Sequence, residues 1–281
     1  MIKQTTIKYP VEIKGVGLQT GVAVKLAVKS APANSGVTFI RTDLPDKPSL
    51  NIQAADLGGM ESVERRTTLG MGPLQVQTTE HLLAALAASS IDNIVFELDN
   101  IELPGLDGSA AGFADALKKA GITEQDAPKK IFKVEEPVWA ADSGAFLAVF
   151  PDKDFRISYT LFYDHPWIGT EFLSTVIDRA IFEKEIAPAR TFCMEAEAAE
   201  LIKRGLGKGA NYDNTLVVGK DGPINTSPRF RDEPVRHKIL DLIGDLYLLG
   251  MPLVGHVVAI KSGHKLNMEL VKKLKSKIIK N

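Results

Sequence analysis

Residues 232–250 constrain the fold of this chain more than any other segment, because they predict a buried helix that carries ionisable side chains. A proline near the start and a glycine at the end bound this helix. Leucine and isoleucine side chains make it apolar almost all round, which indicates burial. His237, Asp241 and Asp245 nevertheless follow one another at i, i+4 spacing along one stripe. Gly244 lies near the same face and leaves room beside it.

Buried charges are costly unless they are paired or bind a metal ion, so the stripe has two interpretations. One is a core histidine with an ordinary ion pair. The other is a metal site, because a histidine and a carboxylate at i, i+4 on one helix can share an ion. The two histidines of an H-E-x-x-H motif do the same.

His81, on a predicted helix over residues 78–88, is a third candidate ligand beside His237 and Asp241. Three nitrogen and oxygen ligands leave one position open for water, as a catalytic site requires. Glu80 directly precedes His81, and a carboxylate in that place can accept a proton from the water. The alternative is that Glu80 only favours the helix dipole near the helix start.

His264 lies in a turn over residues 261–265, between a predicted strand and a predicted helix. A turn can present an imidazole to a cleft. Asp245, one helical turn beyond the candidate ligands, is placed to orient this imidazole and to hold its charge. The alternative is an exposed loop histidine.

Length and composition bound the class of protein. At 281 residues the chain is long for one core and comfortable for two domains of about 130–150 residues each. The net charge of −1 gives no reason to expect nucleic acid as a partner. The single cysteine, Cys193, excludes a disulfide framework and a cysteine-rich zinc site. The N-terminus lacks the apolar core of a signal peptide, and no apolar run approaches the ~20 residues of a membrane span, so we expect a cytoplasmic protein without a transmembrane segment.

The order of predicted elements repeats, since each half of the chain has a helix, a strand, a glycine turn and a second helix. His81 and His237 both lie near the start of the first helix of their half, and we interpret the pattern as a structural duplication. The predicted fold class is α+β, with two similarly built domains over residues 1–125 and 126–281. Each is a sheet layered with helices, and the active site lies at their interface. Residues 121–130, polar and without periodicity, are the expected linker.

The individual elements follow from alternation, helix-forming composition and turn residues. In the first half we expect short strands within residues 2–58, strands at 65–68, 74–77 and 93–98, and helices at 78–88 and 110–120. In the second half we expect strands at 132–138, 145–150, 155–163, 215–219 and 254–261, and helices at 195–204, 232–250 and from about 266 onwards.

Several motifs occur together and carry a resemblance to a known family. They are Thr79-Glu80-His81-Leu82, Ile91-Asp92-Asn93-Ile94-Val95, Leu106-Asp107-Gly108-Ser109-Ala110, Ala189-Arg190-Thr191-Phe192, Val235-Arg236-His237-Lys238, Asp241-Leu242-Ile243-Gly244-Asp245 and Lys261-Ser262-Gly263-His264. The set resembles the UDP-3-O-acyl-N-acetylglucosamine deacetylase family, bacterial zinc amidases that commit the pathway to lipid A. The likeness runs through essentially the whole chain.

The resemblance implies two domains with Zn²⁺ at their interface. It implies that His81, His237 and Asp241 hold the metal and that Glu80 is the general base. His264 would be the general acid or an electrostatic stabiliser.

The resemblance also implies how the substrate is bound. The Thr191 hydroxyl would help to hold the oxyanion. Phe192, Lys238 and Gly263 would contact the substrate, the lysine towards the diphosphate. An inserted strand–helix–strand over about residues 192–218 would form a tunnel for the acyl chain.

Two details of the sequence bear on these expectations. Ala196, Ala199, Ile202 and Leu206 recur at helical spacing, as a tunnel wall or a plain core face would both require. Gln19 stands where the family commonly has histidine, a departure that does not touch the zinc ligands.

The leading hypothesis is hydrolysis of the N-acetyl amide of a UDP-linked, 3-O-acylated glucosamine, with release of acetate in the committed step of lipid A biosynthesis. Zn²⁺ is the expected cofactor and Fe²⁺ the alternative. A rival is a non-haem iron oxygenase, because two histidines and one carboxylate also form a facial triad; Glu80 would then be superfluous. A second rival is a nucleotide-binding module that uses residues 205–209, although that run fails the Walker spacing.

The tail, residues 266–281, supports a weaker hypothesis. Leu270, Leu274 and Ile278 recur every four residues, and lysines crowd the remaining faces. Such a helix is suited to weak contact with an anionic membrane surface. The alternative, which we favour, is an apolar stripe docked on the second domain, with lysines complementing the helix dipole. We expect a monomer.

Overall fold

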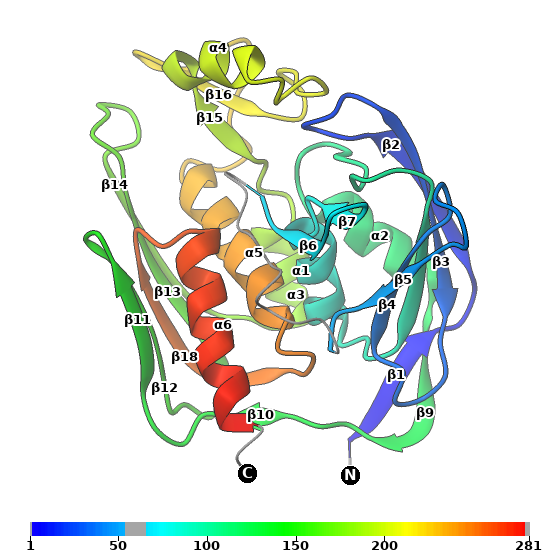
Figure 1. Cartoon of the computed structure of the whole chain (residues 1–281). Coiled ribbons are helices and arrows are strands. Elements are labelled where there is room, and N and C mark those ends of the chain that lie inside the picture. The colour runs from blue at the N-terminus through cyan, green and yellow to red at the C-terminus, as the bar shows by residue number, and fades with distance from the viewer. Residues whose placement is uncertain (1, 54–65, 279–281) are drawn as a thin grey trace.

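Two β-sheets form the outer layers of the molecule, and helices lie between them (Figure 1). This computed structural model describes residues 2–53 and 66–278. One sheet comes from the first half of the chain and the other from the second half, which confirms the α+β class. The division into domains at residue 125 remains a prediction.

The sheet of the first half runs in the order β2-β3-β8-β4-β5. Alternate residues of β3 are buried, so that Leu26 and Val28 face the helices while the lysines between them face solvent. The elements of this half are β1 (Lys3–Ile7), β2 (Val11–Val16), β3 (Ala23–Ser30), β4 (Val37–Arg41), β5 (Ser49–Asn51), β6 (Thr68–Met71), β7 (Leu74–Gln77), α1 (Glu80–Ser89), β8 (Ile94–Leu98) and α2 (Ala111–Ala120).

The sheet of the second half runs in the order β11-β12-β18-β13-β14, and β10 pairs with β18. Its inner face packs on α5 and α6 (Figure 1). The elements of this half are β9 (Ile122–Pro128), β10 (Phe132–Lys133), β11 (Val138–Asp142), β12 (Ala145–Phe150), β13 (Phe155–Phe162), β14 (Thr170–Val176), α3 (Arg179–Ile181) with a short π-helix (Phe182–Ile186), β15 (Phe192–Met194), α4 (Glu195–Lys203), β16 (Leu216–Gly219), β17 (Gly222–Pro223), α5 (Glu233–Tyr247), β18 (Leu253–Ile260) and α6 (His264–Ile278).

The connection between the halves differs from the prediction. Residues 121–130 are not an irregular linker, because they contain β9, which pairs antiparallel with β1 and sets Ile122 opposite Ile7. A strand held by backbone hydrogen bonds to a remote partner needs no hydrophobic periodicity. For this reason β9 could not be recognised from the polar composition of its residues.

Most other predicted elements are confirmed to within a few residues, and the remaining differences are few. No element was predicted where α3 and its π-helix lie, nor at β17. The strand expected over 132–138 is divided into β10 and the start of β11, β14 was not predicted, and α6 begins at His264. Residues 54–58 and residue 65, which we expected to be in strands, lie outside the described residues.

The tail helix α6 docks on the protein, as the favoured alternative predicts. Leu270 and Leu274 are fully buried, and α6 contacts α5, β11 and β12. Its leucine stripe is therefore already covered, which removes the apolar face on which membrane contact was argued. Within residues 2–53 and 66–278, no helix is both long and apolar enough to cross a membrane.

The helices α1 and α5 cross in direct backbone contact at Gly244. A Cβ at this position would lie 2.0 Å from the backbone oxygen of Glu80, so a side chain there would force the helices apart. Leu83 of α1 and Leu240 of α5 are fully buried in the same continuous core. The crossing brings the first turn of α1 beside the ionisable stripe of α5.

We expect Gly244→Ala to lower the free energy of unfolding. In a helix interior, alanine is more stabilising than glycine by about 0.5–1 kcal/mol. Overpacking of this kind, however, typically costs about 1–3 kcal/mol and occasionally more. Urea unfolding measures the difference. Gly263→Ala is the matched control, because a Cβ there meets nothing within 4 Å. A Gly244→Ala midpoint at or above that of the wild type would show that the crossing does not need glycine.

Candidate metal centre and catalytic site

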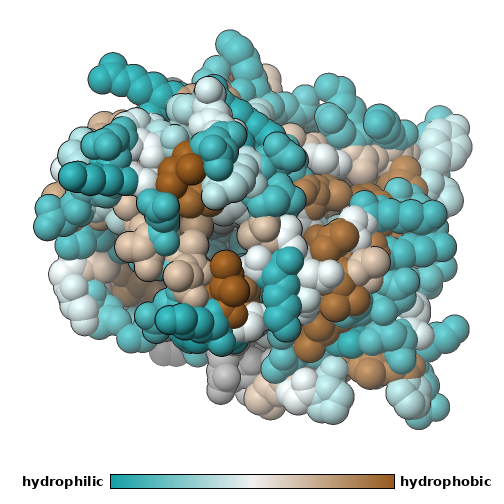
Figure 2. Space-filling view, turned by 90° about the horizontal axis from the view of Figure 1, so that it is seen from above, coloured by the Kyte–Doolittle hydropathy of each residue, from teal (hydrophilic) through white to brown (hydrophobic). Residues whose placement is uncertain are grey.

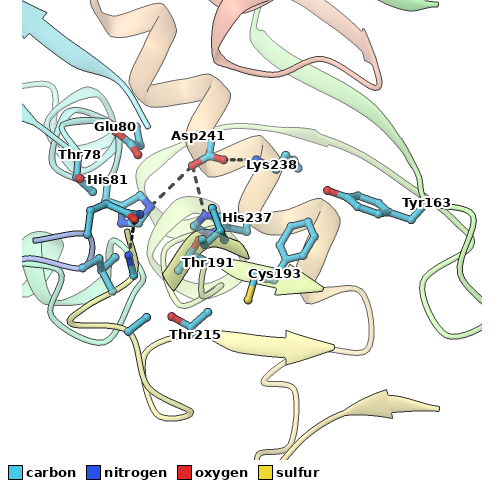
Figure 3. Close-up of a pocket in the computed structure, with 16 residues that line it drawn as sticks. Thr78, Glu80, His81, Tyr163, Thr191, Cys193, Thr215, His237, Lys238 and Asp241 are labelled. Carbon is cyan, nitrogen blue, oxygen red and sulfur yellow. Dashed lines mark hydrogen bonds and ion pairs between the residues drawn. The ribbon is translucent and has the colours of Figure 1, made fainter. Parts of the chain in front are cut away.

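His81 of α1 and the pair His237 and Asp241 of α5 converge at the helix crossing (Figure 3). His237 Nε2 lies 3.4 Å from Asp241 Oδ1, and His81 Nε2 lies 3.8 Å from the same oxygen. All three side chains are buried, and their ligand atoms lie within 4.8 Å of one another. The structure thus brings together the three residues that the sequence singles out as candidate metal ligands.

Both imidazoles are neutral near pH 7. Burial, reinforced by the neighbouring His237, lowers the pKa of His81 to about 3, and burial likewise lowers the pKa of His237. The Nδ1–H of His237 donates to the backbone oxygen of Ala189 at 3.0 Å. The Nε2 lone pair of His237 is therefore directed to the site, as a metal ligand requires.

Asp241 supplies a negative charge to the same cluster. Burial alone would raise the pKa of Asp241, but the adjacent His237 and the Lys238 ammonium outweigh burial and hold that pKa well below its usual range. Lys238 Nζ donates to Asp241 Oδ2 at 2.6 Å, while Oδ1 lies towards the two histidines. Two neutral nitrogen donors and one anionic oxygen are a donor set that suits a catalytic Zn²⁺.

Glu80 lies beside this cluster at the first position of α1. Its carboxyl is almost fully buried, and burial, opposed by the nearby His264, raises the pKa of Glu80 to about 7. The carboxylate oxygens of Glu80 and Asp241 and a ring nitrogen of His264 lie within 4.8 Å of one another. A carboxyl with a pKa near neutrality is well matched to accept and release a proton.

His264, at the start of α6, is held by Asp245. Its Nδ1–H donates to Asp245 Oδ2 at 2.8 Å. Burial would lower the pKa of His264, but the charge and hydrogen bond of Asp245 outweigh burial and raise this pKa to about 9. His264 is buried, so the interpretation as an exposed loop histidine was wrong. Its Nε2 lies 3.9 Å from Asp241 Oδ2 and faces the site.

Two members of this cluster were missed by the sequence analysis. The Thr67 hydroxyl donates to Asp245 Oδ1 at 2.5 Å, and Asn267 Nδ2 donates to Asp245 Oδ2 at 2.8 Å. Neither residue carries a sequence signal, because threonine is ordinary strand material and the asparagine lies in a lysine-rich tail helix.

A cavity of about 170 Å³ adjoins the candidate metal ligands (Figure 3). Thr191, Phe192 and Lys238 line it, and Lys238 Nζ lies 5.8 Å from the centre of the Phe192 ring. The backbone N–H of Thr191 donates to Gly108 O at 2.8 Å, which fixes that side of the wall. Gly263, the remaining predicted substrate contact, is not one of the described residues that line the cavity.

The predicted insert is present as β15, α4 and β16. The side of α4 that was expected to line a tunnel or a core is instead exposed to solvent. Leu201 and Gly207 line the cavity, whereas Ala196, Ala199 and Ile202 are exposed, Ile202 at 66%. Those three residues were expected in a tunnel wall or a core face, and both interpretations were wrong. The helix α4 rests on β15 and β16 with one side only, at one end of the molecule (Figure 1).

Gln19 fastens the loop that follows α4. Its side-chain Oε1 accepts from the Gly207 N–H at 3.0 Å, and its backbone oxygen accepts from the Lys208 N–H at 3.2 Å. The Gly209 N–H donates to Leu18 O at 3.0 Å. These three amides are therefore engaged within the protein, which argues against a phosphate-binding loop at residues 205–209.

The fold and the site together define a class of protein, a metal-dependent hydrolase with an α+β fold. The triad of candidate ligands lies beside a carboxyl of near-neutral pKa and a cationic imidazole. This pairing of a proton acceptor with a proton donor suits hydrolysis and is not needed for oxygen activation at iron.

The chain belongs to the UDP-3-O-acyl N-acetylglycosamine deacetylase family, whose model matches residues 4–276. It is 42% identical to a UDP-3-O-acyl-N-acetylglucosamine deacetylase of Chlamydia caviae over 275 residues, which cover 96% of each chain. It is 40% identical to the deacetylase of that name from Nostoc sp., over 97% of this chain and 98% of the relative. A third relative of the same name, from Bdellovibrio bacteriovorus, is 39% identical over 98% of this chain and 90% of its own.

The geometry predicts that His81→Ala and His237→Ala each lower bound metal well below one ion per chain, because each removes one of three neighbouring donor atoms. Metal analysis of purified protein measures the stoichiometry. His256→Ala is the control, since that imidazole hydrogen-bonds to Ser158 in the second sheet. Full metal content in both ligand variants at micromolar protein would contradict the assignment.

Proposed function

We propose that this chain hydrolyses the N-acetyl group of a UDP-linked, 3-O-acylated N-acetylglucosamine and releases acetate, in the committed step of lipid A biosynthesis. The observation that carries the proposal is the buried cluster of His81, His237 and Asp241 with Glu80 and His264 beside it, in a chain of the deacetylase family.

The family is metal-dependent, and the donor set fits one divalent cation. His81, His237 and Asp241 would hold Zn²⁺, with Fe²⁺ as the alternative ion. When bound, the cation supplies a Lewis acid that polarises the acetyl carbonyl and lowers the pKa of water.

Glu80 acts as the general base. It accepts a proton from the water that attacks the amide carbon, and its raised pKa lets it be ionised near neutral pH and still hold that proton. The Thr67 N–H, which donates to Oε2 at 3.0 Å, fixes the orientation of the carboxylate.

His264 acts in its cationic form. Held by Asp245 at Nδ1, it directs Nε2 towards the site, where the proton is available to the departing amine or to the negative charge on the carbonyl oxygen. The Thr191 hydroxyl, on the cavity wall, would donate a further hydrogen bond to that oxygen.

The cavity wall would recognise the rest of the substrate. Phe192 offers an aromatic face, and Lys238 offers an ammonium for the diphosphate. Gly263 would contact the substrate through its backbone. Leu201 is the described member of α4 that would meet the acyl chain. A cytoplasmic location and a monomeric state remain predictions.

The reaction should show a bell-shaped dependence of kcat/KM on pH, measured by acetate release. Glu80 must be ionised, so the rate rises with pH up to about 7, and a bound cation would move this limb lower. His264 must be protonated, so the rate falls above about pH 9. Glu80→Ala should keep its metal and lose roughly 10²–10⁴-fold in kcat, the usual range for a positioned base.

The same assay of His264→Ala assigns the basic limb. Loss of activity with an altered basic limb supports the role of His264 as the proton donor. An unchanged basic limb would show that another group titrates there. A metal-replete Glu80→Ala protein that works within a few-fold of the wild type would remove Glu80 from the mechanism.

A further inference from the structure

We propose that Thr67 is a positioning residue for the hydrolysis, which sets the orientation of both proton-transfer groups, Glu80 and His264. The inference rests on the proposed function and adds a residue outside the metal ligands and outside the cavity wall. Thr67 lies just before β6 and is buried, with 2% of its surface exposed.

The hydroxyl of Thr67 connects to His264 through Asp245. It donates its one proton to Asp245 Oδ1 at 2.5 Å and lies 3.1 Å from His264 Nδ1. A hydroxyl that has given its proton to a carboxylate can only accept from the imidazole. The Nδ1–H of His264 is therefore shared between Asp245 Oδ2 at 2.8 Å and Thr67 Oγ1.

The backbone of Thr67 connects to Glu80. Its N–H donates to Glu80 Oε2 at 3.0 Å, and its carbonyl oxygen accepts from the Thr79 N–H and the Thr79 hydroxyl, each at 3.3 Å. Thr79 precedes the first residue of α1, so these bonds tie Thr67 to the helix start that carries Glu80. One residue thereby contacts the proposed base through its backbone, and the proposed acid through its hydroxyl, both directly and by way of Asp245.

This arrangement fixes a carboxylate that would otherwise have two orientations. Asp245 is fully buried; its Oδ2 accepts from His264 and Asn267, and its Oδ1 accepts from Thr67. Without the hydroxyl, Oδ1 would lose that donor, at the cost of a buried unpaired oxygen. Rotation of the carboxylate to recover a partner would turn the imidazole and move Nε2 away from the reacting atoms.

The effect should appear in kcat and not in KM, because Thr67 is not among the residues that line the cavity. Thr67→Val keeps the shape and removes the hydroxyl; we expect kcat to fall about 10- to 100-fold, with KM and metal content unchanged. Thr67→Ser restores the hydroxyl and should recover activity to within about threefold of the wild type.

Thr68→Val is the matched control. Thr68 is the next residue, is buried to the same degree, and its hydroxyl has no hydrogen-bond partner in the described structure. The same substitution there should leave kcat unchanged. A comparable fall in kcat for Thr68→Val would show that valine at either position disturbs the site, and would overturn the proposal.

A double-mutant cycle separates positioning from packing. If Thr67 acts through Asp245, Thr67→Val should change kcat less than about threefold in an Asp245→Asn background. A loss of kcat as large in that background as in the wild type would show that Thr67 does not act through Asp245, and would overturn the proposal.

A spectroscopic measurement makes the test independent of the reaction. The imidazole Nδ1–H proton of His264, assigned by its loss in His264→Ala, should shift or broaden in the NMR spectrum of Thr67→Val and stay in place in Thr67→Ser and Thr68→Val. An unmoved signal in Thr67→Val overturns the proposal whatever the activity. A wild-type protein that releases no acetate, with the signal behaving as expected, overturns the proposed function and leaves the link between Thr67 and His264 standing.

Discussion

The contact of α1 with α5 at Gly244 is the interaction on which the site depends. The two helices come from different halves of the chain, and each carries only part of the chemistry: Glu80 and His81 on one, His237 and Asp241 on the other. Because the backbone of Glu80 would lie 2.0 Å from a Cβ at Gly244, a larger residue would separate the parts. The surrounding sheets and buried leucines hold the crossing in place.

Burial at this crossing, together with specific partners, gives neighbouring groups different charge states. It makes both candidate histidine ligands neutral by lowering their pKa values, and it raises the pKa of Glu80 to about 7. Specific partners reverse its effect elsewhere: Lys238 keeps Asp241 anionic, and Asp245 raises the pKa of His264 to about 9. Neutral ligands, a base and a cationic donor thus coexist within one buried cluster.

The sequence predicts those parts of the site that lie on one helix, because i, i+4 spacing survives folding unchanged. It predicts the stripe of α5 and the candidate role of His81. It misses features set by partners distant in sequence: Thr67, whose hydroxyl bonds to Asp245, and β9, which is held by β1. It also cannot tell which side of α4 is covered, because Ala196, Ala199 and Ile202 have the spacing of a packed face and are exposed.

Metal reconstitution tests the central claim most directly, namely that the helix crossing builds one metal site on which hydrolysis depends. The protein is stripped with a chelator, Zn²⁺ is added back in known amounts, and acetate release from the UDP-linked acylated sugar is followed. Activity should be absent from the stripped protein, return in proportion to added Zn²⁺ and level off at about one ion per chain, as three neighbouring ligands predict. Full activity of the metal-free protein, or a plateau only at two ions per chain, would contradict the account.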